Sequence, residues 1–86
     1  MIQVHVFLPA GKGKLHIQEL STRGGHGNYS VLFTQGKQTV GKGTIEGFDR
    51  KDGYWALIKE ALLFAPNGGE IDEAILLDLD TGGWRH

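Results

Sequence analysis

The sequence predicts an α+β protein with a five-stranded, mixed but mainly antiparallel sheet in the order ββββαβ, and one amphipathic helix packed on one face of the sheet. Three observations lead to this prediction. Segments between residues 2 and 47 alternate apolar and polar side chains, residues 49–65 repeat apolar side chains at helical spacing, and residues 74–80 form a nearly continuous apolar run.

Four strands are expected before the helix. They cover residues 2–8, 15–20, 28–33 and 38–47, and glycine-rich turns or loops separate them, the longest being STRGGHG at 21–27. The first two should form a hairpin. Glycines inside the fourth strand offer no side chain to pack, which indicates a bulge, an edge position or close approach of another backbone. We expect the fourth strand to be a bent edge strand.

The helix is expected over residues 49–65. Counted at about 100° per residue, its apolar side chains fall within an arc of roughly 180°, which predicts one broad buried face. Tyr54 and Trp55 belong to this predicted buried face. Asp49 or Asp52 can accept hydrogen bonds from the free N–H groups of the first turn, so the helix start is well marked.

After the helix, AILLDLD at residues 74–80 is interrupted by a charge only at Asp78 before its final Asp80. Such a run is typical of a strand covered on both faces, so we expect it to be central. The strand–helix–strand order implies a right-handed crossover and a parallel pairing with an earlier strand. Residues 81–86 are expected to form a loose C-terminal tail.

Length and composition limit the class of protein. A chain of 86 residues predicts one domain, 1–86, and the absence of cysteine excludes disulfides and thiolate metal sites. No apolar run is long enough to cross a bilayer, so we expect no membrane partner and a cytoplasmic location. The net charge of −1 combines +4 over residues 1–51 with −5 over residues 52–86.

One candidate site is acidic. Asp78 and Asp80 share a face at the carboxyl end of the predicted last strand, where open α/β sheets usually bind ligands. Glu19 is the natural third carboxylate, and together the three residues could bind Mg²⁺. The alternative is that Asp80 begins a turn and Asp78 is half-exposed. We expect no cofactor unless Mg²⁺ binds here.

The order of these segments resembles the first half of the ribonuclease H-like fold. GNYSVLF, a glycine-containing strand, GYWALIKEALLFA and ILLDLDTG follow one another as the second strand, third strand, helix and fourth strand do in that family. The resemblance implies a two-Mg²⁺ nuclease site with carboxylates on the first strand, near the helix start and at the end of the fourth strand. Asp80 or Asp78 matches the last position and Glu19 approximately the first, but Tyr54 or Trp55 occupies the helix position. We therefore expect a truncated or inactive relative.

A second candidate site is basic. Exposed N–H groups in glycine-rich turns can bind phosphate, and basic side chains there would add charge attraction. Neither GKGK nor GKG has the spacing of a phosphate loop, and solvated turn residues are the alternative explanation. The basic residues in or beside such turns are Lys12, Lys14, Arg23, His26, Lys37 and Lys42.

A third candidate is an interface with a second copy of the chain. One helix can cover only one face of the sheet, so the other face should keep apolar residues that a partner would cover. The predicted interface residues are Phe7, Leu20, Leu32, Leu63 and Trp84.

The sequence thus predicts a small, non-catalytic binding module that associates with itself as a homodimer. Two alternatives stay open. One is nucleic-acid binding through the basic turns. The other is a Mg²⁺-dependent phosphodiesterase or nuclease of the ribonuclease H-like type.

Overall fold

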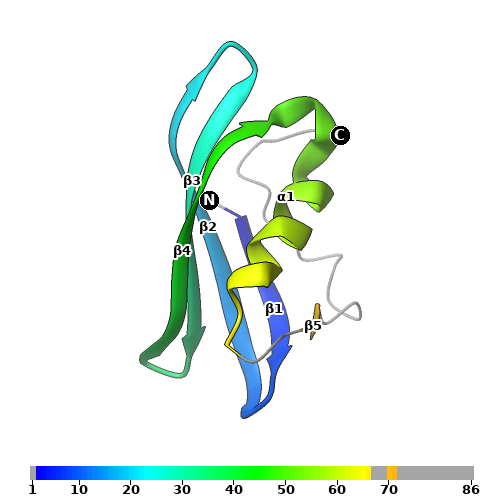
Figure 1. The fold of residues 1–86 in the computed structure, drawn as a ribbon. Coiled ribbons are helices and arrows are strands. Elements are labelled where there is room, and N and C mark those ends of the chain that lie inside the picture. Colours follow the sequence, from blue (N-terminus) through cyan, green and yellow to red (C-terminus); the bar gives the residue numbers. More distant parts are fainter. Residues whose placement is uncertain (1, 67–69, 72–86) are drawn as a thin grey trace.

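The computed structural model describes residues 2–66 and 70–71. Four long strands form an up-and-down antiparallel sheet and are followed by one helix, which lies against one face of the sheet (Figure 1). The elements are β1 (Ile2–Leu8), β2 (Gly11–Arg23), β3 (His26–Gln35), β4 (Gln38–Asp49), the 3₁₀ turn η1 (Arg50–Asp52), α1 (Gly53–Ala61), the 3₁₀ turn η2 (Leu62–Phe64) and β5 (Glu70–Ile71).

The strand order is β4-β3-β2-β1-β5, and every strand pair among the described residues is antiparallel. This confirms the α+β class with a helix on an antiparallel sheet. The two-residue β5 pairs with β1 at Phe7 and Val6. The predicted parallel strand at 74–80 and the predicted tail at 81–86 lie outside the described residues.

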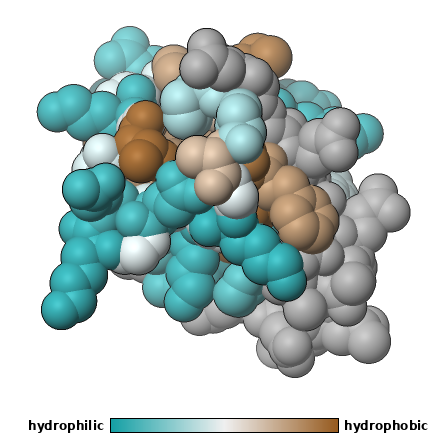
Figure 2. All heavy atoms as spheres, turned by 90° about the horizontal axis from the view of Figure 1, so that it is seen from below, coloured by the Kyte–Doolittle hydropathy of each residue, from teal (hydrophilic) through white to brown (hydrophobic). Residues whose placement is uncertain are grey.

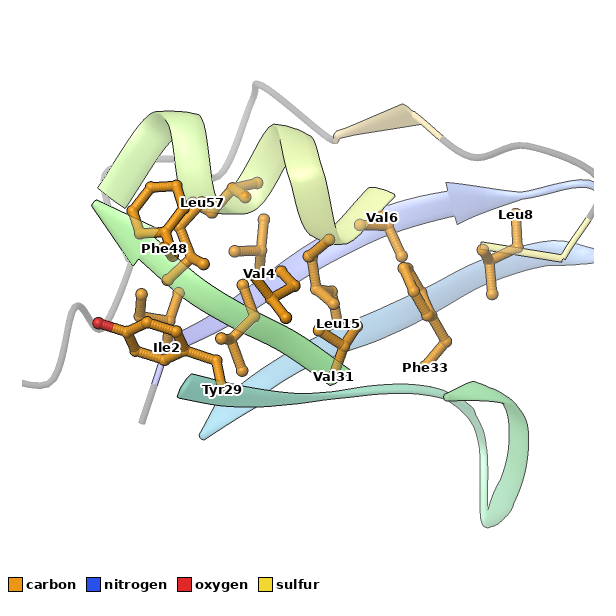
Figure 3. Close-up of a cluster of buried hydrophobic side chains, with 14 residues drawn as sticks. Ile2, Val4, Val6, Leu8, Leu15, Tyr29, Val31, Phe33, Phe48 and Leu57 are labelled. Carbon is orange, nitrogen blue, oxygen red and sulfur yellow. The ribbon is translucent and has the colours of Figure 1, made fainter. Parts of the chain in front are cut away.

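The core is one apolar layer between the sheet and α1 (Figure 3). In β1, every second residue from Ile2 to Leu8 is buried, as the alternation predicts. Phe33 of β3 is fully buried at the middle of the sheet, and Leu57 and Ile58 of α1 close the layer from the other side. The apolar periodicity of the chain therefore fixes which face of the sheet is covered.

The predicted loop at 21–27 is wrong. β2 and β3 continue to Arg23 and His26, which are register partners, and only Gly24 and Gly25 form the turn. Their φ angles of 60° and 81° are those of a tight two-residue hairpin turn, which glycine adopts without steric cost. The polar residues before the turn pair with β3 through their backbones. Their side chains do not alternate between apolar and polar, so the sequence did not indicate a strand here.

The helix starts where the acidic residues predict, but it is shorter than 49–65. The Asp49 carboxylate accepts a hydrogen bond from the backbone N–H of Lys51 at 3.0 Å. A 3₁₀ turn precedes and follows the α-helical part. Trp55 is 37% exposed, contrary to its predicted burial, because it lies near the border of the apolar arc and stacks on Tyr54 instead of entering the core.

β4 is an edge strand of the described sheet, as its glycines predict. A Cβ atom on Gly43 would lie 2.3 Å from Cδ1 of Phe64, and one on Gly41 would lie 3.2 Å from the backbone oxygen of Phe64. The pairing of β3 with β4 also shifts register at Phe33. The two glycines therefore let the end of the helical segment pack closely over the edge strand.

Candidate nucleic-acid interface

The sheet has a second face that α1 does not cover, and we call it the open face. Strand alternation places on it the residues between the buried ones of β1 to β4. These residues are Gln3, His5, Phe7, Lys12, Lys14, His16, Gln18, Asn28, Ser30, Leu32, Thr34, Lys42, Thr44 and Glu46. Figure 1 shows the helix on the opposite side of the sheet from this face.

The open face carries positive charge. Register pairing sets His5 beside Lys14, and places Leu32 of β3 between His16 of β2 and Lys42 of β4. Glu46 of β4 is the acidic residue of this set and lies beyond Thr44, towards the end of the sheet that carries the β2–β3 turn, whereas Lys12 and Lys14 lie towards the other end. Lysine and histidine side chains therefore outnumber the carboxylate on this face of β1 to β4, which favours a negatively charged ligand.

Two shallow hollows lie on the open face. The first has a volume of about 350 Å³, and its lining includes His5, Lys12, Lys14 and Thr34. The second, of about 590 Å³, has Lys42 as its charged residue. Ser30, Val31, Leu32, Gly43 and Thr44 line the rest of the second hollow. Both hollows thus combine lysine with hydroxyl groups, the donors that phosphate oxygens require.

His16 connects β2 to β3 at this face. Its Nε2 lies 2.9 Å from the Thr34 hydroxyl, within hydrogen-bonding distance. Partial burial lowers the pKa of His16 below its usual value, and the positive charge of Lys14 lowers the pKa further. The fold therefore favours the neutral imidazole.

The free energy of unfolding is expected to fall as the pH drops below about 6.5, the ordinary histidine pKa that His16 has in the unfolded chain. The unfolded chain takes up the proton before the folded one does, so protonation favours unfolding. His16→Gln should reduce this loss between pH 7.5 and pH 5.5, measured by urea unfolding.

His5→Gln is the matched control, since it removes an imidazole from the same face without breaking the bond to Thr34. The prediction fails if both variants keep the parent's pH dependence.

The six predicted basic residues do not form one cluster. Lys12, Lys14 and Lys42 lie within strands on the open face and not in turns. Arg23 and His26 flank the β2–β3 turn at one end of the sheet, whereas Lys37 lies in the β3–β4 turn at the other end, as Figure 1 shows. The structure therefore divides the six residues, and only the three strand lysines lie together on the open face. A sequence signal for this was the alternation of basic residues with buried ones along β2.

The predicted acidic site is only partly within the described residues. The Glu19 carboxylate lies 3.1 Å from the Arg50 guanidinium, in an ion pair at the start of the helical segment. Asp78 and Asp80 lie outside the described residues. Within residues 2–66 and 70–71, no three His, Asp or Glu side chains gather as metal ligands would. The Mg²⁺ site stays a prediction.

The predicted interface residues also separate. Phe7, 41% exposed, and the half-buried Leu32 are the apolar residues of the open face, while Leu20, 59% exposed, lies at a bulge between Glu19 and Ser21. Leu63 is 82% exposed in η2, and Trp84 lies outside the described residues. In Figure 2, which views the molecule from below, apolar residues are scattered among hydrophilic ones.

Sequence reasoning missed several polar residues of the open face, among them Gln18, Thr34 and Thr44. Their alternation with buried residues was visible, but their neighbours across the sheet depend on strand register. Within the described part of the chain, no helix is long and apolar enough to span a membrane.

No protein-family model, curated protein or solved structure matches this chain. The resemblance to the ribonuclease H-like fold stays a prediction, because the strand at 74–80 that would pair in parallel is outside the described residues.

Proposed function

We propose that this protein is a binding module that holds nucleic acid on the open face of its sheet. The observation that carries the proposal is the set of three lysines, Lys12, Lys14 and Lys42, on one face of the sheet, where the carboxylate of β1 to β4 is that of Glu46, beyond Thr44 on β4. Lysine side chains attract phosphates and displace their counterions, and this term supplies most non-sequence-specific affinity.

The hydroxyl groups of Ser30, Thr34 and Thr44 support the same function. They belong to the residues that line the two hollows beside the lysines. Hydroxyl groups of this kind commonly bond phosphate oxygens and sugars, which fixes the position of a strand without selecting its sequence. With three lysines, the binding should be modest and strongly dependent on salt.

Lys14→Gln with Lys42→Gln is expected to weaken binding to a mixed-sequence single-stranded oligonucleotide. The slope of log K against log salt should become less negative by about 1.4, since each phosphate contact contributes about 0.7 for single strands. Fluorescence anisotropy at several salt concentrations measures both quantities.

Lys51→Gln with Lys59→Gln is the charge-matched control, because both lysines are exposed on the helical side of the molecule. Equal losses in the two double variants would mean that only net charge matters and would contradict the proposed site. Absence of any binding by the parent protein at low salt would contradict the function itself.

Self-association is the second candidate, and exposed apolar residues of the helical segment favour it. Leu63 is 82% exposed, and Phe64 and Trp55 are each exposed by more than a third. Such residues in a short segment are a common feature of protein–protein contacts. This surface lies on the helical side, so a dimer formed through it would leave the open face free.

A homodimer predicts that the mass measured by sedimentation rises with concentration from the 9.4 kDa of one chain towards twice that value. Leu63→Gln should move this rise to higher concentration, whereas Leu20→Gln, at the β2 bulge, should not. A mass of one chain at all concentrations, up to the millimolar range, would dispose of the homodimer.

A further inference from the structure

We propose that the open face binds a single strand with unpaired bases, in such a way that a backbone phosphate occupies the hollow at His5, Lys12 and Lys14 and a base stacks on Phe7. This inference rests on the proposed function and names the form of nucleic acid that the face accepts. It also assigns separate roles to the lysines and to the exposed aromatic ring.

The first hollow has the composition of an anion site. It is lined by His5, Lys12, Lys14 and Thr34, and by Gly13 and Gly36. None of its lining residues within the described part of the chain carries a carboxylate. His5 and Lys14 are register partners on neighbouring strands, so their side chains leave the sheet side by side. A phosphate with its several acceptor oxygens fits such a set of donors.

Phe7 adjoins this hollow. Phe7 is 41% exposed, and Nζ of Lys12, a residue of the hollow, lies over the ring at 5.9 Å from its centroid. A nucleotide places a negatively charged phosphate and a flat base next to each other, so a phosphate that draws the Lys12 ammonium group towards the hollow would free the ring for the base. The rigid strand β1 holds the ring, because the residues on either side of Phe7 are buried in the core.

A base can stack on Phe7 only if it is not part of a duplex. In a duplex the faces of the bases are stacked on one another and cannot reach a side chain on a sheet. An exposed aromatic side chain on a strand is therefore useful to a single strand and adds little for a duplex. Phe7 itself lies on a strand, β1, and not on a helix or loop that could enter a groove.

The second hollow gives the strand a path across the sheet. Lys42 on β4 lies two strand positions from Lys14 on β2, which is a separation of about 10 Å between their strands. Leu32 lies between the two strands on β3. A short oligonucleotide can therefore reach both lysines while one of its bases lies on Phe7.

The strand β5 borders this site, because its residue 70 occupies the register position opposite Phe7 of β1. The proposed path therefore runs from Phe7 towards β2, β3 and β4, where the basic residues lie, and not towards β5.

The test compares a labelled oligothymidine of about 12 nucleotides, within the usual range for single-strand binding folds, with a duplex of the same length by fluorescence anisotropy at low salt. We expect the single strand to bind at least about fivefold more tightly, which is the effect of one stacked base. Polyphosphate, which carries phosphates without bases, should compete less well than unlabelled oligothymidine at equal phosphate concentration.

Variants of Phe7 separate stacking from charge. Phe7→Leu should weaken single-strand binding about fivefold and leave duplex binding unchanged. Phe7→Trp should keep the affinity, and its added fluorescence should be quenched when oligothymidine binds. Leu20→Ala, an exposed apolar residue at the β2 bulge, is the matched control and should bind as the parent does. Far-ultraviolet circular dichroism checks that each variant is folded.

The outcomes distinguish the two proposals. Equal affinity for duplex and single strand with no effect of Phe7→Leu overturns this inference and leaves the proposed function in place. Competition by polyphosphate as strong as that by oligothymidine also overturns the inference, because the face would then bind phosphate without contacting a base. Failure to bind either nucleic acid overturns both.

Discussion

Phe33→Ala is expected to lower the free energy of unfolding by about 3–5 kcal/mol, the usual cost of removing a buried phenylalanine ring. Phe33 has no exposed surface and lies on β3, an inner strand that pairs with β2 and β4. Its removal leaves a cavity among residues held by strand pairing on both sides, so the surrounding structure cannot collapse into it. The whole free energy of unfolding of such a domain is about 5–15 kcal/mol, so the expected loss is a large part of it.

Thermal and urea unfolding followed by circular dichroism measure this effect. A fall in melting temperature of at least about 12 °C is expected, since 1 kcal/mol corresponds to about 4–8 °C in small domains. Phe7→Ala is the matched control, because Phe7 is on the open face and 41% exposed. Equal losses in the two variants would mean that the sheet does not have one buried and one open face.

Gly13→Ala is expected to lower the free energy of unfolding by about 1–3 kcal/mol, as overpacking in a tight site does. A Cβ atom at this position would lie 2.7 Å from the backbone oxygen of Thr34 and 2.7 Å from Cδ1 of Leu8. The Leu8 side chain can move, but the Thr34 carbonyl belongs to the neighbouring strand β3 and can move only if β2 and β3 separate locally. The added methyl group therefore strains the pairing of β2 with β3.

Urea unfolding measures the effect, and Lys12→Ala provides the control. Lys12 precedes Gly13 on β2 but is exposed, so its loss should change stability by less than about 0.5 kcal/mol. Gly13 also lines the first hollow. If Gly13→Ala remains folded, it should weaken oligonucleotide binding as well, because the shift of β2 moves Lys12 and Lys14. A stability equal to that of the parent protein would contradict the close approach of Thr34.

The alternation of side chains along the strands produces both the core and the proposed site. The same alternation that directs Leu15 and Ile17 towards α1 directs Lys14 and His16 to the open face. Because α1 covers only one face, the side chains of the other face meet solvent. Any ligand of that face contacts the strands directly, and its affinity depends on residues that contribute little to the core.

Local patterns in the sequence were sufficient for some elements. The alternation in β1 predicted its buried residues, and Asp49 marked the start of the helical segment through a bond that forms within one turn. The glycines of β4 predicted an edge strand. In each case the physical cause is a contact between residues near in sequence or a property of one residue type.

Other predictions failed where the cause was distant in sequence. The loop at 21–27 became strand because Ser21 and Thr22 pair with Asn28 and Gly27 through their backbones, which side-chain character does not reveal. Trp55 was assigned to the buried face from helical spacing alone, but the surface that α1 buries depends on how it rests on the sheet.

For this protein, the sequence by itself determined the α+β class and the covered face of the sheet, since apolar alternation acts residue by residue. Only the tertiary structure decided which basic residues belong together. Strand register places Lys42 of β4 on the same face as Lys12 and Lys14 of β2, whereas Arg23 lies at the far end of β2, because this strand continues beyond residue 20. Register is fixed by the turns and the core together, and no single segment contains that information.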